Sequence, residues 1–154
     1  MQLIKTDFNE LVEIKNFEFA DERGKFVKLL NLDFFRNNNL DYYFKESFFS
    51  ISYKNVIRGM HFQIPPSAQT KLVSVLNGSI LDVVLDLRKH EKTFGKYYCV
   101  ELSDKNNKSL YIPKGFAHGF KTLSETATVL YFVNETYSPN DDKGILWDSF
   151  GFDW

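Results

Sequence analysis

Apolar residues in this chain alternate with polar ones or gather in short runs, and helical spacing is rare. The clearest segment is KLVSVLNGSILDVVLDL, residues 71–87, in which Asn77-Gly78 separates two β-branched runs. This dipeptide favours the positive φ angles of a two-residue hairpin turn. Polar turns separate the other predicted strands, which span 47–53, 96–102, 109–113 and 126–133. Short strands at this spacing predict an all-β sandwich or barrel.

One segment departs from the strand pattern. Residues 31–40, NLDFFRNNNL, predict a helix in which Phe34 and Phe35 anchor one face and the asparagine run weakens the end. No repeat, linker or low-complexity segment divides the 154 residues. A chain of this length can bury a core of its own, so residues 1–154 are expected to form a single domain.

The second arm of the 71–87 segment has two faces, because alternate residues of a strand point to opposite sides. One face carries the uninterrupted apolar row Leu81, Val83, Leu85 and Leu87, which predicts that this face lies in the core between two sheets. The other face carries Ile80, Asp82, Val84 and Asp86. We expect Asp86, near the strand end, to be exposed to solvent. For Asp82, solvent and an interior polar cavity are equally good expectations.

Charge and composition exclude several partners. The net charge is −1 and the pI about 6.3, so no basic face is available for nucleic acid or an anionic membrane. The sequence has neither a signal-peptide pattern nor an apolar run of membrane-spanning length, and a soluble, cytoplasmic protein is expected. The single cysteine, Cys99, excludes an internal disulfide and is expected to fill core space.

Two histidines occur in distinctive local sequences. His61 lies in RGMHFQIPPSAQ, and His118 ends the P-x-G-x-x-H pattern of SLYIPKGFAHGF, directly after a predicted strand. The second pattern resembles a motif of the cupin superfamily, which consists of small double-sheet proteins with functional groups in the barrel mouth. The resemblance implies a cupin double-stranded β-helix, or jelly-roll barrel, with one or two short helices.

The sequence argues against a metal site. Metal-binding cupins carry an H-x-H pair and a glutamate, whereas this chain has His61-Phe62-Gln63 and no equivalent glutamate. A zinc site usually needs three protein ligands, and only His61 and His118 qualify here. We therefore expect chemistry without a metal or other cofactor.

Seven longer stretches extend the resemblance over nearly the whole chain and occur in one order: DERGKF, VIRGMHFQIPP, AQTKLV, GSILDVVLDLR, TFGKYYCVELS, YIPKGFAHGF and YSPNDDKGILWD. Together they closely resemble the dTDP-4-dehydrorhamnose 3,5-epimerase family. The resemblance implies a cytoplasmic enzyme, usually a homodimer, that inverts carbons next to the ketone of a nucleotide-linked 4-keto-6-deoxy sugar.

The expected reaction needs a base, a group that stabilises an enolate, and an acid. A ketone at C4 acidifies the hydrogens at C3 and C5, and neutral histidine is a suitable base near neutral pH. His61 matches the family's base, Lys71 a lysine that contacts the substrate, and Tyr131 the proton donor. Without the resemblance, the simpler interpretation is that His61 is a core histidine hydrogen-bonded to backbone groups, Lys71 a solvent-exposed lysine and Tyr131 a core aromatic residue.

Other positions match residues that contact the substrate. Arg23 and Arg58 match arginines near the diphosphate, since a guanidinium donates paired hydrogen bonds to such groups. Tyr137 matches a tyrosine that stacks on the base, and His118 a histidine near the keto oxygen. Phe26, Gln63 and the acidic position Asp142 complete the matched set.

Three positions depart from the family pattern. A glutamate usual two residues after Phe26 is Lys28 here, and the usual Gln-x-Asn pair is Glu46 and Phe48. These changes reverse hydrogen-bond donors and acceptors, and a site built for one base rejects another when its polar groups are unpaired. The hypothesis is a nucleotide other than dTDP, with GDP first because Glu46 can accept hydrogen bonds from guanine. The alternative is that Lys28 and Glu46 pair with each other.

Family members also continue beyond the tryptophan that matches Trp154, and an aspartate there orients the base. Asp82 is the expected substitute for this aspartate, because strand alternation places it on the polar face of its strand. Otherwise the reaction is less demanding, such as a single inversion at C3 or C5, or the substrate is larger, such as a keto-heptose. Two other functions stay open, a 3,4-ketoisomerase and a sugar-nucleotide-binding cupin that has lost catalysis. The joint presence of His61, Lys71 and Tyr131 favours epimerisation.

Overall fold

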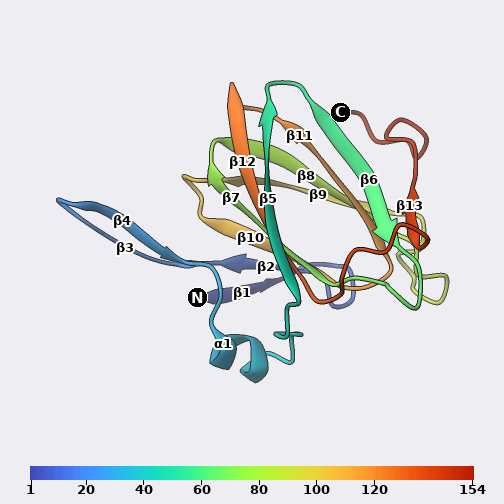
Figure 1. Ribbon diagram of the computed structural model, residues 1–154, viewed down its shortest axis with the longest axis horizontal. Helices are drawn as coiled ribbons and strands as arrows, with labels where there is room; N and C mark the ends of the chain where they lie inside the picture. Colours follow the sequence, from blue (N-terminus) through green and yellow to red (C-terminus); the bar gives the residue numbers. More distant parts are fainter.

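The computed structural model describes all 154 residues as two antiparallel sheets packed face to face, with a two-stranded arm projecting from them (Figure 1). The six-stranded sheet contains, in spatial order, β1 (Gln2–Lys5), β2 (Val12–Lys15), β10 (Lys108–Ile112), β7 (Lys71–Asn77), β12 (Thr126–Val133) and β5 (Glu46–Tyr53).

The five-stranded sheet has the order β13 (Asp142–Gly144), β6 (Ile57–Gln63), β11 (Phe116–Thr122), β8 (Ser79–Asp86) and β9 (Tyr97–Ser103). The arm consists of β3 (Phe17–Asp21) and β4 (Gly24–Lys28). The predicted all-β class is confirmed, and the four strands predicted outside the 71–87 segment begin and end within one residue of the observed strands. No helix of the protein is long and apolar enough to span a membrane.

The hairpin predicted over residues 71–87 is wrong, although both strands exist. β7 pairs with β10 and β12 in one sheet, whereas β8 pairs with β9 and β11 in the other. Gly78 has the expected positive φ of 81°, but its amide donates to the Asp104 carboxylate, 2.9 Å away. The turn therefore crosses from one sheet to the other, because each arm finds both of its partners elsewhere in the chain.

The helix predicted over residues 31–40 is confirmed in a shorter form. α1 spans Leu32–Asn37, and the side chain of Asn31 caps it by accepting from the Phe34 amide at 2.8 Å. The asparagine run ends the helix as expected, with Asn39 at a positive φ of 56°. Phe35 is fully buried and anchors α1 against the outer face of the six-stranded sheet.

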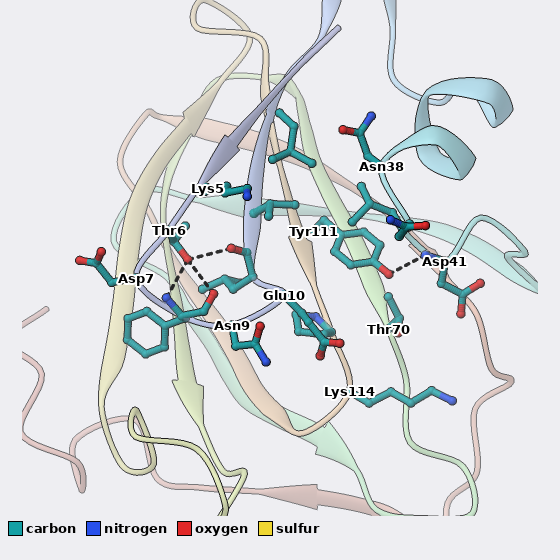
Figure 2. A pocket seen from close by; sticks show the side chains of 17 residues that line it. Lys5, Thr6, Asp7, Asn9, Glu10, Asn38, Asp41, Thr70, Tyr111 and Lys114 are labelled. Atoms are coloured by element: carbon teal, nitrogen blue, oxygen red, sulfur yellow. Dashed lines mark hydrogen bonds between the residues drawn. The ribbon is translucent and has the colours of Figure 1, made fainter.

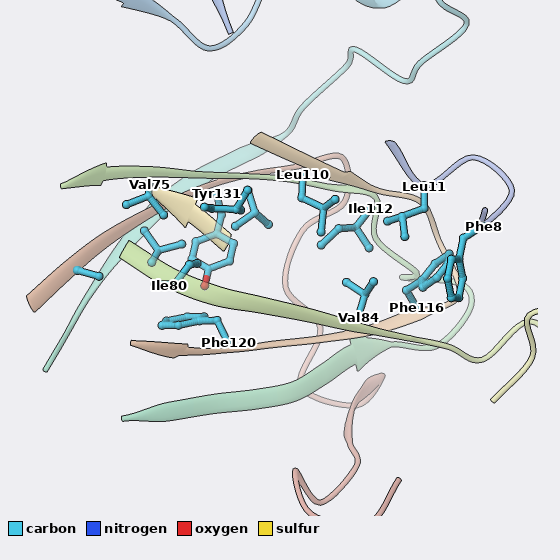
Figure 3. Packing of buried hydrophobic residues seen from close by; sticks show 14 residues of the cluster. Phe8, Leu11, Val75, Ile80, Val84, Leu110, Ile112, Phe116, Phe120 and Tyr131 are labelled. Atoms are coloured by element: carbon cyan, nitrogen blue, oxygen red, sulfur yellow. The ribbon is translucent and has the colours of Figure 1, made fainter. Parts of the chain in front are cut away.

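The two faces of β8 are the reverse of the prediction. Ile80 and Val84 point into the main core between the sheets (Figure 3), on the same face as Asp82 and Asp86, and both carboxylates are fully buried. The apolar row lies on the outer face of the sheet, where Val83 and Leu85 pack under the C-terminal segment. That segment brings Phe150, Phe152 and Trp154 over the sheet. The apolar row therefore lies on an outer face that the C-terminal segment covers. The prediction that Asp86 is exposed is wrong.

The prediction for Cys99 is also wrong, because its side chain is exposed. Cys99 lies opposite Val83 on β9, the edge strand of the five-stranded sheet. The strand pattern around it was correct, but the cysteine occupies a part of the outer face that the C-terminal segment leaves uncovered.

Candidate active site

A cavity of about 560 Å³ opens between the two sheets and collects most of the predicted site residues. Its walls come from β5, β6, β7, β11 and β12, together with the segment that leads into β13. The predicted residues that line it are Phe48, Arg58, His61, Gln63, Lys71, His118, Tyr131, Tyr137 and Asp142.

The two histidines are direct neighbours across paired strands. His61 on β6 lies opposite His118 on β11, so both imidazoles project from the same wall. Two glycines allow this pairing: a Cβ on Gly119 would lie 2.7 Å from the Arg58 carbonyl oxygen, and Gly59 has a φ of +127°. The sequence RGMH followed by HGF therefore encodes a close approach of two backbones beside the imidazoles.

Asp82 supports His118. Its Oδ2 lies 2.8 Å from Nε2 of His118, and both residues are buried. The other oxygen, Oδ1, is buried without a hydrogen-bond partner in the protein. The carboxylate expected to orient His61 thus orients His118 instead, because β8 pairs directly with β11 and not with β6.

His61 is held in a form suited to accept a proton. Burial lowers the pKa of its imidazole, the nearby Asp142 carboxylate opposes this change, and the charges of Lys71 and His118 lower the pKa further. A pKa below the ordinary value of about 6.5 leaves the imidazole neutral at pH 7.

Lys71 approaches the same cavity from the other sheet. Its Nζ lies 3.5 Å from the carbonyl oxygen of His61. Burial lowers the pKa of this amine to about 8, against the opposing charges of Asp142 and Asp82. Lys71 therefore remains mostly protonated at pH 7 and can stabilise negative charge that develops in the cavity.

Tyr131 also comes from the six-stranded sheet and is almost completely buried (Figure 3). Its ring stacks on Phe48 with centroids 4.9 Å apart and meets the His118 ring edge to face at 6.0 Å. Burial and then the charge of Asp82 raise the pKa of its phenol, so the hydroxyl keeps its proton and can act as an acid.

Arg58 and Gln63 have defined partners within the protein. The Arg58 Nε donates to the Ser52 hydroxyl at 2.7 Å, which fixes the guanidinium beside the cavity. The Gln63 amide nitrogen donates to the carbonyls of Ser67 and Thr136, and its oxygen accepts from the Ser138 amide. Gln63 thereby anchors the segment that carries Tyr137 and leads into β13.

Five predicted residues do not line the cavity: Asp82, described above, and four others. Arg23, Phe26 and Lys28 lie on the β3–β4 arm, which projects away from the sheets in Figure 1. The Arg23 guanidinium pairs with Asp21 at 2.5 Å, and the Lys28 amine lies 5.9 Å from the Phe17 ring centroid. Glu46 begins β5 outside the lining, and no ion pair joins it to Lys28. The alternative that these two residues pair is therefore wrong within one chain.

Sequence reasoning missed two polar residues of the lining, Ser50 and Gln69, and the Gln69 amide nitrogen donates to the Glu135 carbonyl at 2.9 Å. Ser50 lies on β5 two residues from Phe48, and its buried hydroxyl oxygen has no hydrogen-bond partner. Strand alternation places Ser50 on the same face as Phe48, so Ser50 could have been predicted from the choice of Phe48.

A larger cavity of about 800 Å³ lies elsewhere, between the β1–β2 turn and the end of α1 (Figure 2). It contains acidic, basic and amide side chains, including Lys5, Glu10 and Asp41, but no histidine. No group of three or more His, Cys, Asp or Glu side chains in the protein is arranged to hold a metal ion. The smaller cavity is therefore the candidate active site, because it combines an imidazole on one sheet with an amine and a buried phenol on the other.

Comparison with known proteins agrees with this geometry. Residues 5–154 match the family model of dTDP-4-dehydrorhamnose 3,5-epimerase. An enzyme of that name from Methanothermobacter thermautotrophicus is 42% identical, over 99% of this chain and 83% of its own length.

Two solved structures have the same fold and carry ligands. The Bacillus anthracis dTDP-4-dehydrorhamnose 3,5-epimerase, with TDP and pyrophosphate bound, has a TM-score of 0.95 at 38% identity, covering 99% of this chain and 89% of its own. The Legionella pneumophila dTDP-6-deoxy-D-glucose-3,5-epimerase, in complex with dTDP-4-keto-L-rhamnose, has a TM-score of 0.94 at 36% identity, covering 99% and 82%. The expected jelly-roll fold is thus confirmed, and the chain belongs to the dTDP-4-dehydrorhamnose 3,5-epimerase family.

Proposed function

We propose that this isomerase-class enzyme inverts C3, C5 or both in a nucleotide-linked 4-keto-6-deoxy sugar, and that His61 and Tyr131 exchange the protons. One observation carries the proposal: the imidazole projects from the five-stranded sheet, whereas Tyr131 and Lys71 come from the six-stranded sheet across the same cavity. Inversion needs a base and an acid on opposite faces of one carbon, and two facing sheets supply that arrangement.

The steps follow from the chemistry of these groups. Neutral His61 removes the proton next to the ketone, and the electron pair moves into the carbonyl to form an enolate. The Lys71 ammonium stabilises the enolate oxygen, and the His118 imidazole, held by Asp82, lies on the same wall as His61. Tyr131 then delivers a proton to the opposite face of the carbon. Solvent accepts the proton from His61 and reprotonates the phenolate, so the cycle balances.

The proposed nucleotide is dTDP, because both structural relatives described above carry TDP or a dTDP sugar. Tyr137 is exposed at the rim, where its ring is available to stack on a base, and stacking does not select one base. GDP is the second candidate, because Lys28 and Glu46 differ from the residues usual at these positions in the family. Isothermal calorimetry with the two diphosphates separates them: tighter binding of GDP would favour guanine, and tighter binding of dTDP the thymine nucleotide.

Proton exchange tests the reaction directly. The protein is incubated in D2O with dTDP- and GDP-linked 4-keto-6-deoxy sugars, and deuterium incorporation is followed by NMR. Label at C3 and C5 identifies a double epimerase, and label at C3 alone a single-position enzyme. A ketone that moves to C3 identifies a 3,4-ketoisomerase, whereas binding without exchange on any substrate supports the non-catalytic binder.

Two variants test the assigned roles. His61→Asn should reduce exchange by at least about 100-fold, because general base catalysis contributes on this scale, while calorimetric binding of the nucleotide is retained. Tyr131→Phe should retain exchange but lose inversion, because the proton can then return only to the face from which it left. Exchange that survives in His61→Asn refutes the base assignment.

The proposal includes a homodimer, in a cytoplasmic enzyme as the sequence leads us to expect. The arm exposes Phe17, Phe19 and Phe26, and β5 is an edge strand that exposes Phe49 and Ile51. Exposed apolar side chains beside an unpaired edge are typical of an interface between chains. A dimer also gives Arg23, Phe26 and Lys28 a route to a second chain's cavity.

Mass measurement by light scattering tests the dimer, and complementation tests the route of the arm. If arms act between chains, mixing inactive His61→Asn with an arm variant Arg23→Ala restores activity, because some mixed dimers contain one intact site. A monomeric mass, or a mixture with no recovery, contradicts this part of the proposal.

A further inference from the structure

Asp142 is the acidic side chain that lines the cavity containing His61 and Lys71. It lies at the start of β13, which pairs antiparallel with β6 in the register Asp142 opposite Gln63 and Gly144 opposite His61. Residues directly opposite in such a pair share a face, and residues two apart on one strand share it too. Asp142 and His61 are therefore diagonal neighbours on the wall that faces the cavity.

The segment that precedes Asp142 is tightly held. The Asp141 carboxylate accepts from the Ser67 hydroxyl at 2.6 Å and the Ser138 hydroxyl at 2.9 Å. The Ile64 amide donates to the Asp141 carbonyl, and the Asp142 amide to the Ser138 carbonyl. These bonds tie β13 to β6, so the position of Asp142 beside His61 is built into the fold.

The Asp142 side chain is only lightly used within the protein. Its Oδ2 accepts one long hydrogen bond, 3.4 Å, from the Tyr137 hydroxyl, and it forms no ion pair. Asp82, the other carboxylate near this wall, is bonded to His118. The groups that face His61 are Asp142 from β13, Lys71 from β7, His118 from β11, Arg58 from β6, Tyr131 from β12 and Tyr137 from the rim.

We propose that the Asp142 carboxylate, a diagonal neighbour of His61 without a direct hydrogen bond to it, stabilises the imidazolium formed when His61 takes the proton. The inference deepens the proposed function and rests on His61 as its base. Asp142 also faces the Lys71 amine, so one carboxylate balances the two groups that gain or carry positive charge during the reaction. A carboxylate beside a basic imidazole stabilises the charged form in this way.

The electrostatic effects agree with the geometry. The Asp142 charge is the one carboxylate influence that raises the pKa of His61, and it is the larger of two that raise the pKa of Lys71. Without it, burial and the neighbouring cations would depress the pKa of His61 further and leave a weaker base.

The test begins with the ligand-free protein and needs no turnover. The pKa of each imidazole is measured by NMR titration in the wild type, Asp142→Asn and Asp142→Glu, with exposed His90 as an internal reference. Asp142→Asn should lower the pKa of His61 by about 0.5 to 1, as expected for loss of one nearby charge, and Asp142→Glu should restore most of it. An unchanged pKa of His61 in Asp142→Asn overturns the proposal.

Turnover adds a second readout when a substrate is known. Asp142→Asn should reduce kcat by about tenfold with KM changed less than about twofold, and the acid limb of the pH profile should move to lower pH. A rise in KM with unchanged kcat identifies a substrate contact instead and refutes the stabilisation of the His61 imidazolium by Asp142. Asp148→Asn, an exposed carboxylate outside the cavity, is the matched control. If no tested sugar reacts, the titration still decides the proposal, so its failure and that of the proposed function are distinguishable.

Discussion

Asp82 and Asp86 lie on the same face of β8, four residues apart, and both are fully buried, yet their surroundings differ sharply. Both oxygens of Asp86 accept hydrogen bonds. Oδ1 accepts from the backbone amide and from Nε of Arg88, and Oδ2 accepts from Nη2 of Arg88 at 2.7 Å and from the Thr93 hydroxyl at 2.6 Å. Asp82 has a single bond, to His118, and its Oδ1 has no partner in the protein.

The difference favours a structural role for Asp86 and a role in the candidate site for Asp82. A fully paired buried carboxylate stabilises the fold, because its desolvation is offset by hydrogen bonds and by the opposite charge. We call the bonded group of Asp86, Arg88 and Thr93 the clasp. The Arg88 guanidinium also lies 4.4 Å from the Phe116 ring centroid and donates to the carbonyl of Asn9. Asp82 influences both Lys71 and Tyr131 and has one buried oxygen without a partner, a combination that occurs more often at functional sites than in a purely structural core.

The largest expected effect comes from breaking the clasp. Asp86→Ala leaves the Arg88 charge buried without its partner, which should lower the free energy of unfolding by about 3 to 5 kcal/mol. Urea denaturation measures the loss, and the exchange rate per folded molecule should stay close to wild type. A loss below about 1 kcal/mol would show that Arg88 finds enough compensation from Glu10 and Glu91, which lie 3.6 and 3.9 Å away.

The same clasp makes stability depend on pH. Burial alone would raise the pKa of Asp86, but the bonds from Arg88 and Thr93 outweigh it and hold the pKa below its usual value. The stabilisation is therefore complete above the unfolded-state pKa of about 3.9 and is lost as the pH falls through the lower folded-state value. Asp86→Ala should remove this contribution, so the variant and wild type should converge in stability toward low pH.

The second effect is on catalysis. Asp82→Asn removes the carboxylate that holds His118 while preserving the shape of the side chain and a hydrogen bond to His118. Exchange should fall about 10- to 100-fold, a typical effect of losing a group that orients a site histidine. The Tm should change little, because the replaced carboxylate has an unpaired buried oxygen. A large drop in Tm with normal exchange would place Asp82 with Asp86 as a structural residue.

The contrast between the two aspartates could not be read from the sequence. Strand alternation correctly placed Asp82 and Asp86 on one face, but the face assignment used the apolar row Leu81 to Leu87 as the mark of the core. In a two-sheet fold an outer face can be equally apolar when another segment covers it, here the aromatic C-terminal residues. The pairing of Asp82 with His118 depends on β8 lying beside β11, which is a contact between distant parts of the chain.

Most residues of the cavity could be chosen from the sequence because the motifs that carry them are local and distinctive. RGMHFQ and PKGFAH each fix a histidine, and the structure brings the two together through β6 and β11. The arm residues Arg23, Phe26 and Lys28 were matched equally well, yet they lie outside the cavity of their own chain. A sequence motif predicts that a residue contacts the substrate, but it does not show where the fold places that residue.

A third, smaller effect tests Lys71 as a cation from the opposite sheet. If the ammonium stabilises the enolate, activity should decline above a pH of about 8, where this buried amine loses its proton. Lys71→Arg keeps a charge at all working pH values, so the basic limb should disappear even if the plateau rate falls severalfold. Rates measured from pH 6 to about 10 check this. A basic limb that persists in Lys71→Arg assigns the limb to another group.

The smallest expected effect tests whether burial of an ion pair, and not the ion pair alone, gives the clasp its stabilising effect. Lys54 and Glu125 form an ion pair at 2.6 Å, about as short as that of Arg88 with Asp86, but their side chains are 52% and 84% exposed. Water screens such a pair, and the entropy of fixing two long side chains offsets the attraction. Lys54→Ala should therefore shift the Tm by only about 1 °C or less, measured by calorimetry beside Asp86→Ala. A shift as large as that of Asp86→Ala would mean that the short distance, and not the dry surroundings of β8, gives the clasp its strength.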